Sequence, residues 1–250
     1  MIAGMGSTMT APDAPVGPGA RPIAAGAPDS APAPAPVPAA GAPALAAGAP
    51  ALAAGAEEAV RRAVADAVDV QRGLEALAAE IAEAAAICWT ALAADRRVLV
   101  FGNGGSAAEA QHFAAELSGR FARERRALPA LALTTDSSVL TAIGNDYGFE
   151  RVFGRQVEAF GRAGDVAVGI STSGRSPNVV DGLRTARARG LTTIAVAGAS
   201  AAEMAPHADL VLAVAGPSTA RIQEGHLTVL HVICDLVESA LVASEPPAPR

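Results

Sequence analysis

The spacing of apolar residues separates helical from strand-like segments along the chain. Between residues 57 and 95, apolar side chains recur three and four positions apart with charges between them, which predicts amphipathic helices with a break near Gly73. Short apolar runs then alternate with further helical segments. Helical spacing returns over residues 220–242 and predicts a long, buried closing helix. The apolar runs are residues 98–101, 130–133, 166–170, 192–197 and 210–214.

These runs are rich in Val, Ile, Leu and Ala and are nearly continuous, without alternating polar positions. Such runs are typical of parallel strands that are covered by helices on both faces. The lengths of the intervening segments suit strand–helix–strand units rather than hairpins. The sequence therefore predicts an α/β fold with a parallel sheet in one domain over residues 56–243. Sheets of this kind bind ligands beyond the carboxyl ends of their strands.

Residues 1–55 have a different pattern, because they consist almost entirely of Ala, Pro and Gly and contain the repeat GAPALAA at 41–47 and 48–54. Alternating Pro and small residues cannot build a core, so we expect a disordered tail over 1–55 and disorder again over 244–250. The tail has no basic region ahead of an apolar stretch, and no stretch elsewhere is long enough and free of Pro and charge to span a bilayer. These features predict a cytoplasmic protein without a membrane partner.

The charge and the cysteines narrow the function further. A net charge of −6 argues against the basic surface with which proteins bind nucleic acid, so a small-molecule ligand is the better expectation. Cys88 and Cys234 lie far apart and lack the spacing of a metal site, which predicts two buried thiols in a reducing compartment.

Polar residues gather directly after three of the predicted strands. A glycine-serine turn at a helix N-terminus offers free amides and a hydroxyl, a combination that favours phosphate. The third group has four hydroxyls in six residues and can hold phosphate oxygens without Lys or Arg, although hydroxyls at a helix start can also act only as caps. The groups are Asn103, Gly104, Gly105 and Ser106; Thr134, Thr135 and Asp136; and Ser171, Thr172, Ser173, Gly174 and Ser176.

The first turn also fits the Gly-x-Gly-x-x-Ala pattern of dinucleotide-binding turns, at Gly102, Gly104 and Ala107. That pattern expects an acidic residue about 20 positions later, at the end of the second strand. Asp136 lies too far along the chain for this role. A nicotinamide or flavin site is therefore the weaker interpretation.

His112 and Glu116 are four residues apart on a predicted helix, so their side chains share one face and can reach one divalent cation. The alternative is an ordinary surface pair. The closing helix offers Gln223 with either His226 or His231, and the eight residues from Gln223 to His231 rise about 12 Å. Gln223 with His226 is the easier pair by spacing, but the spacing permits both sets and does not choose between them.

Four longer segments carry a recognisable pattern: GNGGSAAEAQHFAAELSGRF, TAIGNDYGFERVF, GDVAVGISTSGRSPNV and RIQEGHLTVLHVICDLVE. Together they resemble the sugar isomerase (SIS) domain family, most closely its members that isomerise phosphorylated seven-carbon sugars. The resemblance extends over about residues 57–241, with the motifs in the same order at compatible spacings. It implies a five-stranded parallel sheet between helices and a homotetramer with active sites at subunit interfaces. The implied reaction converts D-sedoheptulose 7-phosphate to D-glycero-D-manno-heptose 7-phosphate.

The resemblance also implies roles for single residues. It implies one Zn²⁺ per subunit, held by His112, Glu116, Gln223 and His231. The resemblance thus selects His231 rather than His226 as the ligand. Isomerisation through an enediol needs a base beside the carbonyl and an acid for the oxygen, and the resemblance implies Glu116 and His231 for this pair. The residues that match phosphosugar ligands are Asn103, Gly104, Gly105, Ser106, Glu116, Thr135, Asp136, Ser171, Thr172, Ser173, Ser176 and Gln223.

The chain departs from the family pattern at three positions. Ala220 stands where an acidic residue is common, and Ala107 and Ala108 stand where His or another polar residue is common. We expect these changes to affect affinity or sugar preference.

A second family member is the main alternative, a non-catalytic adaptor that binds the bacterial replication initiator protein. The segments GNGGSAAEAQHFAA and TDSSVLTAI resemble it as closely as they resemble the enzyme. The adaptor lacks an acidic residue at the position of Glu116 and a histidine at the position of His231, whereas this chain has both. The enzyme is therefore favoured. A phosphosugar-sensing regulator would add a DNA-binding domain, which the Ala-Pro tail does not resemble.

Overall fold

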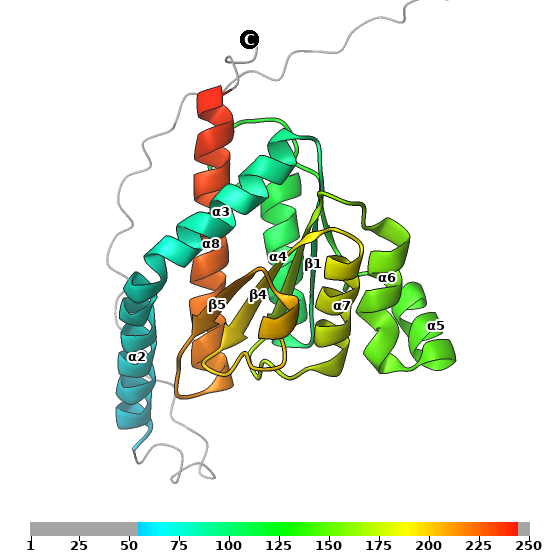
Figure 1. The fold of residues 1–250 in the computed structure, drawn as a ribbon. Coiled ribbons are helices and arrows are strands. Elements are labelled where there is room, and N and C mark those ends of the chain that lie inside the picture. The colour runs from blue at the N-terminus through cyan, green and yellow to red at the C-terminus, as the bar shows by residue number, and fades with distance from the viewer. Residues whose placement is uncertain (1–54, 245–250) are drawn as a thin grey trace, which may run out of the picture. The chain divides into compact units, whose positions relative to one another are not determined.

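The computed structural model describes residues 55–244, which form one parallel sheet flanked by helices (Figure 1). The expected tail and the expected disordered C-terminus lie outside these residues, apart from Gly55 and Ser244. The strands are β1 (Val98–Gly102), β2 (Ala130–Ala132), β3 (Val166–Ser171), β4 (Thr192–Gly198) and β5 (Leu210–Val214). The helices are α2 (Ala56–Gly73), α3 (Ala78–Ala93), α4 (Gly105–Ser118), α5 (Ser137–Tyr147), α6 (Val152–Phe160), α7 (Pro177–Ala188) and α8 (Thr219–Ser244), with short 3-10 helices η1 (Leu74–Leu77), η2 (Phe149–Arg151) and η3 (Ala205–His207).

The predicted elements are confirmed. Each predicted strand lies within one residue of an observed strand at both ends, and the closing helix is α8. The break near Gly73 is the 3-10 turn η1 between α2 and α3.

The sheet has the order β2-β1-β3-β4-β5, and all neighbouring strands are parallel. Because the strands are parallel, the three polar turns that follow β1, β2 and β3 lie at the same edge of the sheet. They are neighbours there because β1 lies between β2 and β3. The edge at which the sequence predicts a ligand site is thus assembled from neighbouring strands.

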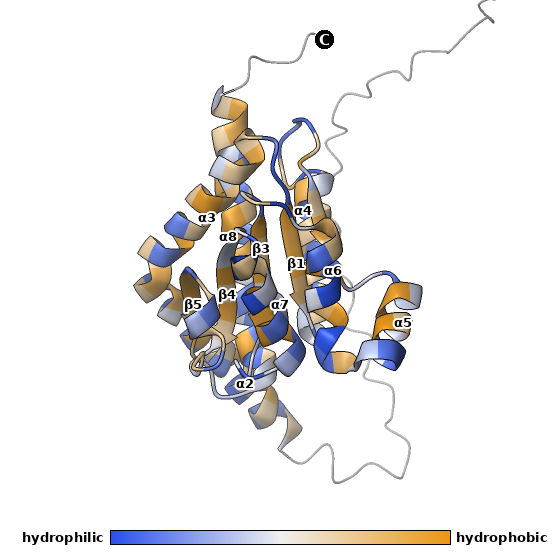
Figure 2. Ribbon diagram, turned by 45° about the vertical axis from the view of Figure 1, so that its right-hand side comes forward, coloured by the Kyte–Doolittle hydropathy of each residue, from blue (hydrophilic) through white to orange (hydrophobic). Residues whose placement is uncertain are grey.

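Both faces of the sheet are buried, which explains why the strands read as continuous apolar runs. Successive side chains of a strand point to opposite faces. Along β1, Val98 and Val100 pack with residues of α3, α4 and α8, whereas Leu99 and Phe101 pack with residues of α6 and α7. The strands are strongly hydrophobic along their whole length, while the helices carry hydrophobic and hydrophilic residues on different faces (Figure 2).

Two helical stretches, Ala56–Ala93 and Thr219–Ser244, are long and apolar enough to cross a membrane by length and composition. The core helices of soluble proteins pass the same test, and α3 and α8 each bury one face in the core, for example Leu92 and Val237. Both stretches contain charged residues, for example Glu224 and Asp235 in α8, so the sequence argument that no long stretch is free of charge still holds.

Candidate active site

The first polar turn connects β1 to α4 through two glycines that the backbone requires. A Cβ atom at Gly102 would lie 2.8 Å from the backbone oxygen of Ile170, closer than side chains are tolerated, and Gly104 has a φ of +56°. The turn closes where the Ser106 amide donates to the Asn103 carbonyl at 3.0 Å. The chain thus enters α4 with the N-terminal amides of the helix at the edge of the sheet.

The first and third turns are joined directly. The side-chain amides of Asn103 and Asn178 exchange two hydrogen bonds of 2.8 Å, and Asn178 lies in the first turn of α7. The N-terminal ends of α4 and α7 are therefore held side by side, since β1 and β3 are neighbouring strands.

The serines of the third turn face one another. The Ser171 hydroxyl lies 2.9 Å from the Ser176 hydroxyl and 3.3 Å from that of Ser173. Ser176 precedes α7, yet its side chain does not cap the helix. Capping is the alternative explanation for such hydroxyls, so this arrangement favours a ligand site for an anion.

The second turn is arranged differently. Asp136 accepts a hydrogen bond of 2.9 Å from the Val139 amide and so caps α5. The Thr135 hydroxyl lies 3.4 Å from the Ala132 carbonyl, and that of Thr134 contacts Gln111 on α4 at 3.2 Å. The Asp136 carboxylate therefore has a structural role, whatever else it binds.

His112, Glu116 and His231 form a cluster between α4 and α8. The Nε2 atoms of His112 and His231 are 2.8 Å apart, and His112 Nε2 is 3.4 Å from Glu116 Oε1. Burial lowers the pKa of the His231 imidazole, His112 lowers it further, and Glu116 partly opposes the shift. A neutral imidazole carries one free lone pair and one N–H, so it can bind a metal ion or pass a proton.

Gln223 lies beside the first turn, because a Cβ atom at Gly105 would overlap its side-chain amide. This placement brings the start of α8 next to the start of α4. Gln223 thus lies among the residues that the sequence predicts for the sugar phosphate.

His226 points away from this cluster and is fully buried. Its Nε2 lies 3.0 Å from the Ala197 carbonyl, and its Nδ1 lies 3.6 Å from Glu109 Oε2. Glu109 is also buried, and neither of its carboxylate oxygens has a hydrogen-bond partner. The structure thus pairs His231, rather than His226, with His112, against the easier sequence spacing.

The residues at this cluster are of the types that bind zinc. Among residues 55–244, no three or more His, Cys, Asp or Glu side chains are arranged as a metal site. The two imidazoles are instead in direct contact, with Glu116 adjacent. Imidazole and carboxylate are common zinc ligands, and ligand atoms around a tetrahedral zinc lie about 3.3 Å from one another, between the two distances seen here.

The cysteines take no part in this site. Both thiols are free and buried, as predicted. Burial raises the pKa of Cys88 to about 12 and, with Glu116 as a smaller cause, raises that of Cys234 as well. Protonated thiols are poor metal ligands and poor nucleophiles.

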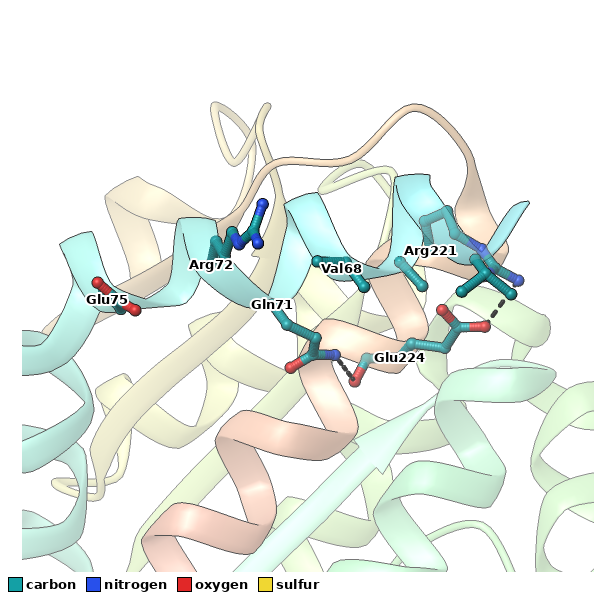
Figure 3. A pocket seen from close by; sticks show the side chains of 8 residues that line it. Val68, Gln71, Arg72, Glu75, Arg221 and Glu224 are labelled. Carbon is teal, nitrogen blue, oxygen red and sulfur yellow. Dashed lines mark hydrogen bonds and ion pairs between the residues drawn. The ribbon is translucent and has the colours of Figure 1, made fainter. Parts of the chain in front are cut away.

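A separate cavity of about 510 Å³ lies between α2 and the start of α8 (Figure 3). Two polar contacts lie along it: Arg221 pairs with Glu224 at 2.7 Å, and the Gln71 amide donates to the Glu224 carbonyl at 3.4 Å. The other lining residues are Val64, Ala67, Val68, Arg72 and Glu75. This surface is more typical of a contact with another protein surface than of a catalytic site.

Three residues near the cluster were not singled out from the sequence: Phe121, Arg125 and Glu238. The Phe121 ring lies against His231 with centroids 5.5 Å apart. Glu238 and Arg125 form an ion pair of 3.2 Å with side chains only 1% and 2% exposed. In the sequence, Glu238 is recognisable as a charged residue on the apolar face of the predicted closing helix.

Comparison with known proteins gives matches over most of the described residues. Residues 64–198 and, in an overlapping match, 158–242 match the SIS domain. The phosphoheptose isomerase of Aquifex aeolicus is 53% identical over 182 residues, which cover 72% of this chain and 95% of the relative. That of Geobacter sulfurreducens is 58% identical over 165 residues, covering 66% and 87%.

Solved structures show the same relationship. The phosphoheptose isomerase of Neisseria gonorrhoeae is 45% identical and superposes with a TM-score of 0.70, covering 74% of this chain and 99% of that one. The enzyme of Francisella tularensis is 34% identical with a TM-score of 0.71, covering 74% and 98%. The chain therefore belongs to the SIS domain family and, within it, to the phosphoheptose isomerases.

Proposed function

We propose that this protein converts D-sedoheptulose 7-phosphate to D-glycero-D-manno-heptose 7-phosphate by proton transfer through an enediol. The observation that supports this most directly is the cluster of His112, Glu116 and His231 on α4 and α8, two helices whose N-terminal ends meet beside the first polar turn. The cluster supplies acid–base groups, and the turns supply an anion site.

The substrate is held by the three turns. The phosphate binds at the N-terminus of α7, where the hydroxyls of Ser171, Ser173 and Ser176 converge. The sugar chain extends toward α4. The residues assigned to substrate binding are Asn103, Gly104, Gly105, Ser106, Glu116, Thr135, Asp136, Ser171, Thr172, Ser173, Ser176 and Gln223.

Glu116 is the base and His231 the acid. The Glu116 carboxylate takes the proton from C1, beside the C2 carbonyl, while the His231 N–H donates a proton to the carbonyl oxygen, which gives the enediol. Return of a proton to C2 with loss of the proton on O1 completes the aldose. The lowered pKa of His231 favours release of its proton to the carbonyl oxygen.

A Zn²⁺ ion is part of the proposal, held by His112, Glu116, Gln223 and His231. When bound, it would polarise the sugar oxygens and stabilise the negative charge of the enediolate. A carboxylate that binds zinc tightly is a weak base, so the Glu116 contact must be loose or movable.

The protein is proposed to act as a homotetramer in the cytoplasm, with its sites at subunit interfaces. Apolar side chains on α2 and α8 support subunit contact, because large apolar groups exposed together mark interaction surfaces. Val60 and Val64 are 62% and 57% exposed, and Val232 and Leu236 on α8 are about two-fifths exposed. Such contacts would also cover the cavity in Figure 3.

The test is direct turnover. Purified protein is incubated with sedoheptulose 7-phosphate, with added zinc and with a chelator, and aldose formation is followed. We expect conversion that zinc supports and the chelator removes. An absence of conversion under every metal condition would refute the proposal and favour the adaptor that binds the replication initiator, which the named relatives and the retained Glu116 and His231 argue against.

A further inference from the structure

A buried ion pair lies behind the candidate active site, where it joins the two helices that carry the acid–base residues. Glu238 is on α8, seven residues after His231, and Arg125 is in the segment that follows α4. Their side chains are 1% and 2% exposed, and Arg125 Nε donates to Glu238 Oε1 at 3.2 Å. None of the steps proposed above uses either residue.

Arg125 binds the C-terminal end of α4. Its guanidinium donates to the Glu116 carbonyl at 2.7 Å, and to the carbonyls of Leu117 and Gly119 at 2.8 Å each. These carbonyls lack intrahelical partners at a helix end, and a cation is the favoured group there. The backbone of Glu116 itself is therefore held by Arg125.

Glu238 binds the backbone after α4. Its carboxylate accepts hydrogen bonds from the amides of Phe121 at 3.0 Å and of Ala122 and Arg123 at 2.8 Å each. These contacts fix the direction of the Phe121 side chain, whose ring packs against His231. The Glu238 carboxylate thus orders the segment after α4. That segment includes Phe121, which contacts His231 on α8.

We propose that Glu238 and Arg125 are positioning residues of the isomerase, which hold Glu116 on α4 at the correct distance from His231 on α8, with Phe121 orienting the His231 ring. The inference rests on the proposed function. A pair that only stabilised the fold would not need to contact the backbone of the base and the neighbour of the acid.

A matched control lies on the same two elements. Arg123 and Asp235 form an exposed ion pair of 2.6 Å between the same segment and α8, with side chains 43% and 47% exposed. Exposed pairs contribute little, so Asp235→Asn changes the connection without disturbing the buried contacts.

The experiment compares Glu238→Gln with Asp235→Asn in the full chain, at a temperature where circular dichroism shows both to be folded. We expect Glu238→Gln to lower kcat about ten- to a hundredfold, since small displacements of catalytic groups have effects of this size. KM should change less than about twofold, because the proposed phosphate site lies on β3 and α7. Asp235→Asn should match the wild type. Equal kcat values for the two variants, or a loss that follows only the unfolded fraction, would overturn the inference.

A second series decides the question if Glu238→Gln does not fold. Phe121→Leu keeps an apolar side chain but removes the aromatic face against His231, and we expect a fall in kcat of about threefold or more at unchanged KM, with Phe121→Tyr close to the wild type. An unchanged kcat for Phe121→Leu would refute the role. If the wild type itself does not isomerise the sugar, the proposed function fails first, and the two failures are thereby distinguished.

Discussion

In the proposed mechanism, Glu116 is the residue on which the chemistry most depends. Its carboxylate lies 3.4 Å from His112 Nε2 and is partly open to solvent, which leaves room for a substrate. We predict that Glu116→Gln lowers kcat by about 10²–10⁴-fold while binding of the phosphosugar persists, because general base catalysis contributes this much. Turnover and calorimetric binding are measured together. Glu124→Gln, an exposed change in the segment after α4, is the control. Unchanged turnover in Glu116→Gln would remove it from the mechanism.

Gly105→Ala tests the contact between the first polar turn and Gln223, both of which are assigned to substrate binding. The added Cβ atom of Gly105→Ala would displace the Gln223 amide, which is a flexible side-chain end. Gly105 has no left-handed backbone, so the fold should keep its stability. We predict a fall in kcat/KM of about tenfold or more, from loss of one charge-assisted contact. Gly73→Ala, which meets no atom, is the control and should retain full activity. Normal activity in both variants would exclude Gln223 from the site.

We expect the two histidines of α8 to have different roles, His226 in stability and His231 in metal binding. His226→Asn removes a buried hydrogen bond to the Ala197 carbonyl and should cost about 1–3 kcal/mol of unfolding free energy, with zinc content unchanged. His231→Asn should retain stability and lose zinc. Metal analysis and thermal melts of the two variants measure both effects. Loss of zinc from His226→Asn alone would reverse the assignment of the ligand.

At the scale of elements, the attachment of the segment after α4 to α8 should depend on pH. Burial alone would raise the pKa of the Glu238 carboxyl, but three backbone amides and Arg125 outweigh it and hold the pKa below the ordinary value of 4.5. A lowered pKa in the folded state gives stability that is complete above the ordinary value and is lost as the pH falls through the lowered one.

We therefore predict that the Tm of Glu238→Gln is lower than that of the wild type by about 5 °C at pH 7, and that the difference shrinks below about pH 4. Thermal melts between pH 7 and pH 3 measure this. Asp235→Asn should show no comparable convergence, since its ion pair is exposed. A constant difference at all pH values would contradict the prediction.

At the scale of the whole molecule, α2 presents an apolar stripe of Val60, Val64 and Val68, all of them exposed. We predict that Val64→Glu reduces the proposed tetramer to smaller species and lowers activity at least about tenfold, because a charge on an apolar contact must be desolvated and the sites are proposed to lie at interfaces. Light scattering after size-exclusion chromatography reports the mass. Arg62→Glu, on the other side of α2, is the control. An intact tetramer in Val64→Glu would place the interface elsewhere.

Much of this molecule follows from local patterns in the chain. The strands were predictable to within one residue because both faces of the sheet are buried, so that each strand is a continuous apolar run. His112 and Glu116 were predictable as a pair because helical spacing places residues four apart side by side. The resemblance then added His231.

Contacts between distant segments could not be predicted in this way. Spacing favours His226 beside Gln223, yet the rotation of α8 against the sheet turns His226 into the core and His231 toward His112. Asn103 finds Asn178 only because β1 and β3 are neighbours, and Glu238 meets Arg125 only where α8 crosses the end of α4. Periodicity along one helix shows which residues share a face, whereas the direction of that face is set by packing with other elements, which no local pattern contains.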